Sequence, residues 1–338
     1  MSETGKGRHL LGRRKFLQIL AVAGAAGSLY GYGVLRTGDQ NHVVRQSRTM
    51  MGTQINLIVY GPDQDQCLHA TTATFARMEL LESFFSRFQH ESALSRLNVT
   101  GQLDAAPDEF LQVLTLAEHI SQVSDGAFDI SVLPLLRLYG QQQLPTQAQL
   151  AETLPLVDYR NIKRSGNKVR FTRQGMGITL DGIAKGYVVD QGVATLKQSG
   201  FNNVYVEAGG DLMVTGTKPA DAPWRIGIQK PRADSTESMT ILTLRSTLAI
   251  ATSGDYMQPF SDDLQNHHIL DPRQGISPPD LASATVTAPS VALADSLATA
   301  SMVLGPQRSI ALLQHFDDCE GLFIDKQLNH YKTSGFQG

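Results

Sequence analysis

The stretch LDGIAKGYVVD, Leu180 to Asp190, marks a passage from one kind of secondary structure to another. Its opening residues continue a short apolar run, Gly182 permits a turn, and a helix is predicted from about Ala184. Two short strand patterns precede it, KVRFT at Lys168 to Thr172 and ITL at Ile178 to Leu180. The stretch therefore predicts the end of a strand, a glycine-containing turn and the start of a helix.

Strand and helix patterns also alternate in the residues before and after this stretch. Further strands are predicted at residues 55–61, 203–208, 224–229, 241–244, 248–251 and 283–288. Further helices are predicted from Asp63, from Pro107 and over residues 292–304. Helices and strands interleave, but the strands come in hairpin-like pairs. This order predicts an α+β fold with largely antiparallel sheets packed with helices, rather than a doubly wound parallel sheet.

Two helices carry a clear apolar face. The first has Asp63 as its N-cap, and its apolar face is predicted to consist of Cys67, Thr71, Phe75, Met78, Leu81 and Phe85. The second has acids in its first turn, where the helix dipole favours them, and its stripe is Phe110, Val113, Ala117, Ile120 and Val123. Both faces predict burial against a common core.

Composition narrows the function classes. The chain has 338 residues, a net charge of -3, 41% hydrophobic and 18% charged residues, and no basic stripe that would indicate nucleic-acid binding. Length alone permits about two domains. There are two cysteines, Cys67 and Cys319, and we expect Cys67 to be a buried free thiol.

The N-terminus has the layout of an export signal. In GRRKFLQILAVAGAAGSLYGYG, Gly12 to Gly33, two arginines precede a weakly apolar stretch rich in alanine and glycine. The layout predicts a twin-arginine signal, cleaved or retained as a weak anchor; the alternative is a transmembrane anchor, which the glycines disfavour. We assign residues 1–40 to the signal and a linker, and residues 41–338 to one domain. The expected location is the periplasm, reached through the twin-arginine translocase.

Several motifs carry groups suited to chemistry. The turn before Ala184 offers backbone N–H groups and a cation, Lys185, to a phosphate, although an ordinary turn explains it equally. In ADSLATA, Asp295 and Thr299 are four residues apart on one helix face and offer hard oxygens to Mg²⁺, the alternative being an exposed acid and a threonine bonded within its helix. In HHILDPRQG, His268 is either a surface residue or a general base.

Glycine-rich turns follow two further strands. EAGGD, Glu207 to Asp211, permits either a close approach to a ligand or a tight hairpin. ATSGDY, Ala251 to Tyr256, places hydroxyls and N–H donors in a loop after a strand.

Taken together and in order, these motifs resemble the ApbE family of FAD:protein FMN transferases. The matching blocks are M-G-T from Met51, FSRFQHESALSRLN from Phe85, SDGAFDISVLPL from Ser124, LDGIAKGYVVD, AGGD, AIATSGDY, HILDPRQG and ATVTAPSVALADSLATASMVLG, which ends at Gly305. They span Met51 to Gly305, which is nearly the whole chain after the predicted signal.

The resemblance implies an α+β fold related to the T-fold, with FAD as substrate and Mg²⁺ as cofactor. It implies transfer of FMN to a threonine or serine of a target flavoprotein, with release of AMP. It places at the nucleotide Met51, Phe88, Ala127, Phe128, Asp129, Thr179, Asp181, Lys185 and Ile269. It assigns to the metal Asp295, Thr299 and a backbone carbonyl, that of Ala184. His268 is the implied base, and Asp255 is a second candidate.

This sequence departs from the family pattern in two places. The family commonly has an acid where Thr179 stands and a glycine where Asp181 stands, so either residue is a candidate contact. Glu207 stands where the family often has asparagine. The D-G-I-A-K-G variant with a twin-arginine signal is similar to the NosX-type branch, which implies a NosR-like membrane protein of nitrous-oxide respiration as target. The alternatives are a periplasmic FAD-binding carrier or assembly chaperone, or an FAD pyrophosphatase.

Overall fold

A single antiparallel sheet of nine strands forms the centre of the molecule. The computed structural model describes residues 33–36, 42–140, 144–232 and 238–337. The strand order is β1-β2-β3-β7-β8-β11-β12-β13-β14, and every neighbouring pair is antiparallel. The strands are β1 (Gly33–Arg36), β2 (His42–Met50), β3 (Thr53–Gly61), β7 (Val204–Ala208), β8 (Asp211–Thr215), β11 (Leu248–Gly254), β12 (Leu281–Ala288), β13 (Glu320–Asp325) and β14 (His330–Lys332). The predicted α+β class is confirmed.

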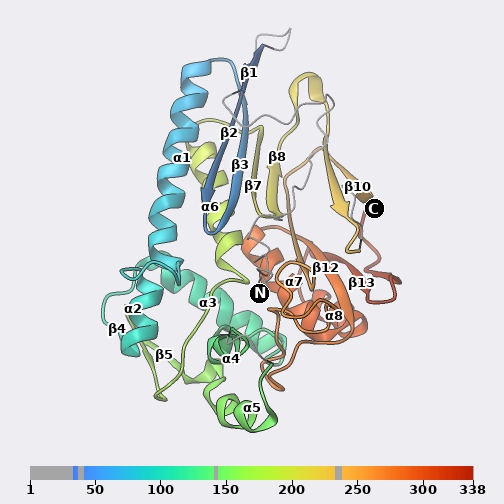
Figure 1. Cartoon of the computed structure of the whole chain (residues 1–338). Coiled ribbons are helices and arrows are strands. Elements are labelled where there is room, and N and C mark those ends of the chain that lie inside the picture. The colour runs from blue at the N-terminus through green and yellow to red at the C-terminus, as the bar shows by residue number, and fades with distance from the viewer. Residues whose placement is uncertain (1–32, 37–41, 141–143, 233–237, 338) are drawn as a thin grey trace, which may run out of the picture.

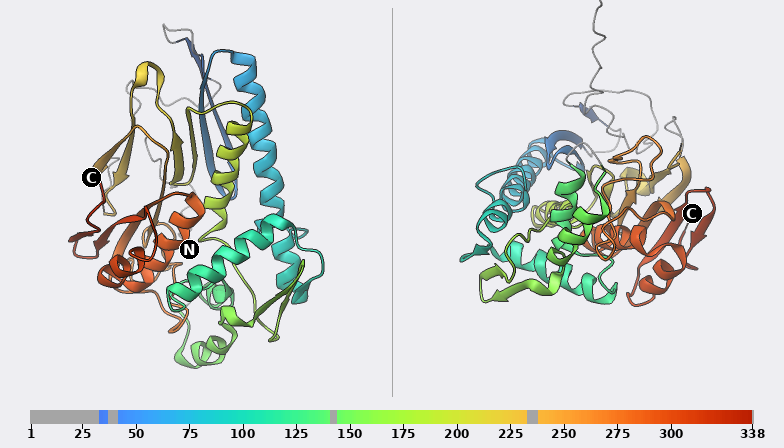
Figure 2. Two further views of the ribbon diagram at one scale, coloured as in Figure 1. Left: turned by 180° about the vertical axis from the view of Figure 1, so that it is seen from behind. Right: turned by 60° about the horizontal axis from the view of Figure 1, so that its bottom comes forward.

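Four helices cover one face of this sheet (Figures 1 and 2). They are α1 (Gln64–Phe85), α6 (Ala184–Gln198), α7 (Val291–Leu304) and α8 (Pro306–Leu313). The main hydrophobic core lies between these helices and the sheet, and it includes Phe75 and Met78 of α1, Val188 of α6, and Leu297 of α7. Helix α6 lies between α1 and α7, so its first turn is enclosed on both sides.

The chemistry of the sequence explains the position of α1. The Asp63 carboxylate accepts a hydrogen bond from the Gln66 backbone N–H at 2.8 Å, as an N-cap should. The predicted apolar face is confirmed, since all six of its residues are buried. Burying a phenylalanine such as Phe75 stabilises the fold by about 1.5–3 kcal/mol.

A two-stranded ribbon covers the opposite face of the sheet. It consists of β9 (Trp224–Gln229) and β10 (Ser238–Leu244). Its inward side chains, among them Trp224 and Leu242, form a second core with Tyr205 and Val214 of the sheet. The sheet is therefore buried on both sides over its middle strands, which explains the continuous apolar runs there.

A smaller lobe lies beyond the first turns of α6 and α7. Its elements are α2 (Ala93–Thr100), β4 (Gln102–Leu103), α3 (Asp108–Val123), η1 (Ile130–Val132), α4 (Leu133–Tyr139), α5 (Gln147–Thr153), η2 (Leu154–Leu156), η3 (Tyr159–Asn161), β5 (Ile162–Ser165) and β6 (Lys168–Phe171). One further short helix, η4 (Pro219–Asp221), precedes β9. The strands of the lobe form a small sheet in the order β4-β6-β5. The lobe contacts the main body through α2, which packs against α1, and through α3, which packs against α1 and α7.

One predicted strand is wrong. Residues Ile178–Leu180 form no strand, because the side chain of Asn98 takes both backbone groups of Ile178. The Asn98 Nδ2 donates to the Ile178 carbonyl at 2.8 Å, and the Ile178 N–H donates to Asn98 Oδ1 at 2.7 Å. The Thr179 N–H donates to the Ile130 carbonyl, which ties the segment to the smaller lobe instead of to a sheet.

Several predictions concern the ends of the chain and its cysteines. The export-signal motif, Gly12 to Gly33, lies outside the described residues except for its last glycine, which begins β1. Strand β1 lies inside the stretch assigned to the signal and linker, so the sheet begins before residue 41. Within the described ranges, no helix combines the length and apolarity needed to cross a bilayer. Cys67 and Cys319 are both buried and free, as expected for Cys67.

Candidate active site

Helices α6 and α7 each offer a carboxylate to backbone N–H groups in the first turn of the other. The Asp190 side chain of α6 accepts from the backbone N–H groups of Val291 and Ala292, at 2.7 and 2.9 Å. In return, the Gly186 N–H at the start of α6 donates to Asp295 Oδ2 of α7 at 3.3 Å. Unpaired N–H groups and the positive end of the dipole make a helix N-terminus favourable for an anion. Each helix therefore stabilises the other.

This exchange requires the two backbones to be very close. A Cβ on Gly186 would lie 2.5 Å from the Val291 carbonyl oxygen and 2.7 Å from Ala292 Cα. These neighbours are backbone atoms and have little freedom to move. The glycine at position 186, in the first turn of α6, is thus explained by helix packing.

Lys185 lies between two buried acids. Its Nζ forms an ion pair with Asp211 and is 3.9 Å from Asp295 Oδ2. Asp211 follows the Gly209-Gly210 turn, and Glu207 fixes that turn by accepting from the Gly210 N–H at 2.7 Å. The second oxygen of Glu207 accepts from Asn56 Nδ2 at 2.5 Å. The A-G-G-D motif is therefore a tight hairpin that also supplies a counter-ion to Lys185.

Three hydroxyl and carboxylate side chains converge beside this lysine. Thr299 lies one turn after Asp295 on α7, and its Oγ1 is 3.3 Å from Ser253 Oγ at the end of β11. A Cβ on Gly182 would lie 2.9 Å from Thr299 Oγ1, so the turn leaves that oxygen uncovered by any side chain of its own. Burial raises the pKa of Asp295, and the positive charge of Lys185 partly offsets the effect.

The donor set fits a hard divalent cation. Among the described residues, no group of three or more histidine, cysteine or acidic side chains is arranged to hold a metal. A cation here must therefore draw on hydroxyl and carbonyl oxygens as well as Asp295, and Mg²⁺ accepts such a mixed set, completed by water and substrate phosphate. Asp295, Thr299 and the carbonyl of Ala184, the first residue of α6, are the predicted ligands.

The turn itself has few free donors. The N–H groups of Ile183 and Ala184 both donate to the Leu180 carbonyl, and that of Gly186 is taken by Asp295. A phosphate at this turn would thus be attracted more by the Lys185 ammonium than by a cradle of amides. This differs from the amide cradle that the sequence suggests.

Of the two candidates in the unusual motif, Asp181 is the accessible one. Thr179 is buried, and its Oγ1 accepts from the Asp181 N–H at 3.3 Å. The Asp181 side chain is half exposed and pairs with Arg87, with Nε and Oδ2 separated by 3.0 Å. Arg87 also lies over the ring of Phe88, whose side chain is 75% exposed. An acid, a guanidinium and an open aromatic face thus stand together at the edge of the turn.

Met51 lies in a strained turn between β2 and β3. Its φ is 53°, and its N–H donates to Glu82 Oε1 at 2.8 Å near the end of α1. The M-G-T motif is therefore pinned to the same end of α1 that leads into Arg87 and Phe88.

The G-A-F-D motif is largely enclosed. Ala127 and Phe128 are buried in the core. The Asp129 carboxylate accepts from the N–H and hydroxyl of Ser131 and from the Tyr159 N–H. These bonds give Asp129 a structural task in ordering the smaller lobe, and burial raises its pKa.

His268 lies within electrostatic reach of the turn. Burial lowers its pKa to about 4, and the neighbouring His267 and Lys185 act in the same direction, while Asp181 opposes them. Its Nδ1 is buried and has no hydrogen-bond partner among the described residues. Ile269 beside it is buried in the core. A histidine with this pKa is neutral at physiological pH and can accept a proton.

Asp255, the second candidate base, is engaged elsewhere. It is fully buried, and Arg232 donates to both of its oxygens at 2.7 and 2.6 Å. Lys326 lies 3.8 Å away. These contacts favour a structural ion pair, because acting as a base would disrupt two charge-assisted hydrogen bonds.

Four residues that lie in the site were not among the site residues predicted from the sequence. They are Asp211, Ser253, Arg87 and Glu82. Asp211 and Ser253 stand in the A-G-G-D and T-S-G-D motifs, shortly after the ends of strands predicted from the sequence, so the sequence did mark their positions. The pairing of Arg87 with Asp181 depends on how α1 and α6 pack, which no local pattern reveals.

Comparison with known proteins identifies the family of the chain. The family model described as the ApbE family matches residues 51–323. The chain belongs to the ApbE family. The chain is 30% identical to the FAD:protein FMN transferase of Vibrio cholerae, over 83% of this chain and 86% of that one. It is 31% identical to the enzyme of that name from Haemophilus influenzae, over 68% and 70%.

Solved ApbE structures have the same fold. The flavin transferase ApbE from Vibrio cholerae superimposes with a TM-score of 0.78 at 29% identity, covering 88% of this chain and 98% of that one. The ApbE protein from Thermotoga maritima gives 0.79 at 27% identity, covering 86% and 97%. The predicted membership of the ApbE family and the predicted ApbE-like fold are both confirmed.

Proposed function

We propose that this chain is an enzyme that transfers FMN from FAD to a threonine or serine hydroxyl of a protein, releasing AMP, with Mg²⁺ as cofactor. The observation that carries the proposal is the cluster of Lys185, Asp295 and Thr299 at the facing ends of α6 and α7. Such a cluster suits a diphosphate, whose cleavage depends on charge neutralisation and alignment. The names of the relatives support the same reaction.

Each residue of the cluster has a distinct task. Asp295, Thr299 and the Ala184 carbonyl would hold Mg²⁺, which when bound offsets the negative charge of a diphosphate. Lys185 directs a positive charge at the same region, and Asp211 keeps its side chain in place. The 3.9 Å between Lys185 Nζ and Asp295 leaves the lysine close to the metal ligands without a direct hydrogen bond to this acid.

His268 is the proposed base. It would take the proton from the attacking hydroxyl as the oxygen bonds to the phosphorus next to the flavin and AMP departs. Its pKa of about 4 keeps the ring unprotonated at neutral pH, and the ring lies near Lys185 and Asp181. A base with a low pKa is weak, so its value lies in its position more than in its basicity.

Nucleotide contacts are proposed at the rim of the turn. The exposed Phe88 ring offers a flat apolar surface for an aromatic group, and Arg87 beside it offers a cation. Met51 is fixed to the same end of α1 through Glu82.

The proposal is tested by incubating the purified chain with FAD, Mg²⁺ and a peptide containing Ser-Gly-Ala-Thr. Covalent flavin on the peptide is read by in-gel fluorescence, and AMP is measured in the same mixture. We expect both products in equal amounts. FAD binding with neither product would instead indicate a carrier or chaperone. AMP with free FMN and no labelled peptide would indicate a pyrophosphatase.

We further propose that the enzyme works in the periplasm after export by the twin-arginine translocase, on a NosR-like membrane flavoprotein. The twin-arginine motif and the D-G-I-A-K-G variant support this. The test is cell fractionation of the full chain and of an Arg13→Lys/Arg14→Lys variant. Retention of the variant in the cytoplasm, with the parent chain in the periplasm, is the expected result. Equal distribution of the two chains would contradict it.

A further inference from the structure

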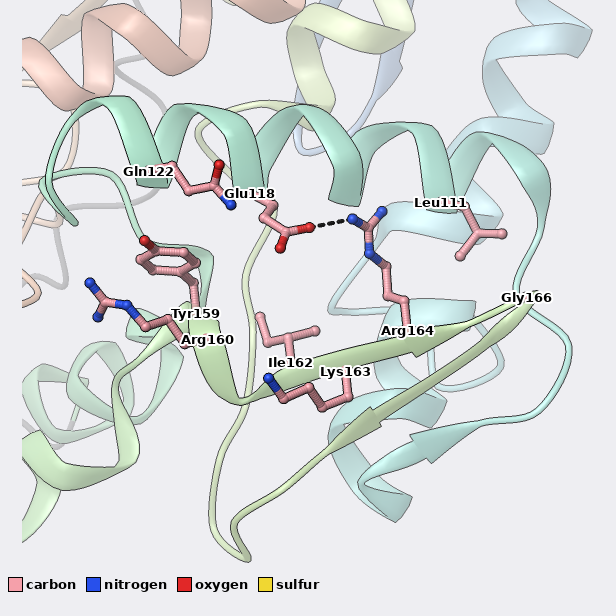
Figure 3. A pocket seen from close by; sticks show the side chains of 9 residues that line it. All are labelled: Leu111, Glu118, Gln122, Tyr159, Arg160, Ile162, Lys163, Arg164 and Gly166. Carbon is pink, nitrogen blue, oxygen red and sulfur yellow. Dashed lines mark hydrogen bonds and ion pairs between the residues drawn. The ribbon is translucent and has the colours of Figure 1, made fainter.

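A cleft of about 770 Å³ lies in the smaller lobe (Figure 3), and none of its lining residues belongs to the cluster around Lys185. One wall is α3, with Leu111 and Gln122. The other is β5 and the residues just before it, including Tyr159, Arg160 and Lys163. Its volume is within the range of about 300–1,000 Å³ typical of ligand sites.

The strand that forms this wall has a free edge. The small sheet has the order β4-β6-β5, so β5 pairs only with β6 among the described strands. In an antiparallel pair, alternate residues point their backbone N–H and C=O groups away from the partner. A strand edge of this kind is a template for a further extended segment.

Positive charge is concentrated along the same edge. Three cations line the cleft, Arg160, Lys163 and Arg164, against one acid, Glu118, which is paired with Arg164. Figure 3 shows Arg164 reaching Glu118, while Arg160 and Lys163 point away from that pair. Arg160 has an exposed contact with Asp158 at 3.4 Å and lies over the ring of Tyr159.

The strands add more charge of the same sign. Lys163 stands directly opposite Arg170 on β6, and like charges at such positions destabilise a sheet. Lys168 lies at the end of the same hairpin, and all three side chains are exposed. The whole chain has a net charge of -3, so this basic concentration is local.

We propose that this cleft is a docking surface for an extended, acidic segment of the acceptor protein, which adds as a strand beside β5. A lipid surface offers no row of backbone donors and acceptors to the free edge. A second copy of this chain would bring the same cations against it. An acidic polypeptide can pair its backbone with the free edge of β5 and also neutralise the cations that line the cleft. The inference rests on the proposed function for the identity of the partner.

The cleft is coupled structurally to the proposed active site. Strand β6 leads through residues 172–177 to Ile178, just before the turn at Gly182. Asn98, in the helix before β4, holds Ile178 by two hydrogen bonds. A segment held at β5 would raise the local concentration of a tethered hydroxyl at the turn.

The direct test is binding of a fluorescein-labelled decapeptide of alternating glutamate and valine, followed by fluorescence anisotropy on the full chain at low salt. We expect Arg160→Glu/Lys163→Glu to raise its Kd at least tenfold. The matched control, Arg225→Glu/Arg308→Glu, reverses two exposed cations elsewhere and should change the Kd less than twofold. Equal losses in both variants would overturn the proposal.

Two further probes separate a strand-like mode from simple charge attraction. A glutamate–valine peptide N-methylated at every residue cannot donate to the β5 edge from either of its own edges, and it should bind at least tenfold more weakly; equal binding would overturn strand addition. Vesicles of phosphatidylglycerol provide the second probe. Capture of the parent chain by vesicles, lost in Arg160→Glu/Lys163→Glu and without peptide binding, would assign the cations to lipid and overturn the proposal.

Flavin transfer gives the functional readout. With an acceptor peptide that carries an acidic extension, the same double variant should raise KM for the peptide at least tenfold and leave kcat and KM for FAD unchanged. An unchanged KM for the peptide would contradict docking. Absence of transfer by the parent chain would count against the proposed function alone, because the anisotropy measurement requires no FAD.

Discussion

Replacing Gly186 with alanine should destabilise the protein even though alanine is the better helix former. Gly186 lies in the first turn of α6, where α7 crosses closest. On helix propensity alone, the change would stabilise by up to about 1 kcal/mol. The added Cβ would lie 2.5 Å from the Val291 carbonyl oxygen, well inside ordinary contact distance.

The free-energy cost of this clash exceeds the gain in helix propensity. The neighbouring atoms are backbone atoms of α7, so relief requires the two helices to separate. Overpacking costs about 1–3 kcal/mol, and a clash with backbone atoms that cannot move aside falls in the upper part of that range, at about 2–3 kcal/mol. The separation also lengthens the 3.3 Å contact from the Gly186 N–H to Asp295, and it moves Asp295 relative to Lys185. We therefore expect a net loss of about 1–2 kcal/mol in the free energy of unfolding, and at least a tenfold loss of FMN transfer.

Gly192 provides the matched control in the same helix. An alanine Cβ there would meet the terminal methyl of Met78, the flexible end of a side chain that can adopt another rotamer. Urea unfolding and the in-gel transfer assay should show Gly192→Ala to be more stable than Gly186→Ala by at least about 1 kcal/mol, with transfer retained. The gain in helix propensity is common to both variants, so this difference reflects the overpacking cost of the backbone clash. Wild-type stability and activity in Gly186→Ala would refute the proposed role of the α6–α7 contact.

Three further predictions concern charged and titrating groups. Asp295→Ala should abolish Mg²⁺-dependent transfer, and unchanged transfer measured across a Mg²⁺ titration would remove Asp295 as a metal ligand. His268→Ala should bind FAD normally, as measured by fluorescence quenching, yet transfer FMN at least a hundredfold more slowly, as expected for loss of a general base. In the parent chain the transfer rate should fall only as the pH drops through about 4, where His268 becomes protonated. A fall in the transfer rate near pH 6.5 would contradict this assignment. Burial lowers the pKa of His267 to about 4, so the stability that its neutral form contributes is complete above pH 6.5 and is lost as the pH falls toward 4. Urea unfolding at pH 7 and at pH 4.5 should show that His267→Asn loses less stability between these two pH values than the parent, by up to about 3 kcal/mol. Equal losses in the two proteins would refute this prediction.

Local chemistry made much of the fold predictable. The N-cap at Asp63 and the apolar face of α1 follow from short-range patterns, and both are present. The start of α6 at Ala184 and the strand ending at Ala208 also match. Such features depend on a few neighbouring residues, so the sequence specifies them directly.

Long-range partners limited the prediction elsewhere. Residues Ile178–Leu180 have the composition of a strand, but Asn98, eighty positions earlier, takes the backbone groups of Ile178. The sequence also does not reveal that the Gly186 N–H faces Asp295 and not a ligand. Both outcomes depend on tertiary packing, which overrides local preference.

The same limit applies to the candidate site. The spacing of Asp295 and Thr299 placed both on one face of a helix, as observed. The ion pair of Lys185 with Asp211 joins a helix and a strand end that only the folded chain brings together. Asp255 was a candidate base because of its position after a strand, and its pairing with Arg232 could not be read from that position.

The most direct test of the account is the covalent labelling of a Ser-Gly-Ala-Thr peptide by the purified chain with FAD and Mg²⁺. In-gel fluorescence with AMP quantified in parallel should show one AMP for each labelled peptide, and both products should disappear in Asp295→Ala. A peptide that stays unlabelled while the chain binds FAD, or labelling that persists in Asp295→Ala, would contradict the account.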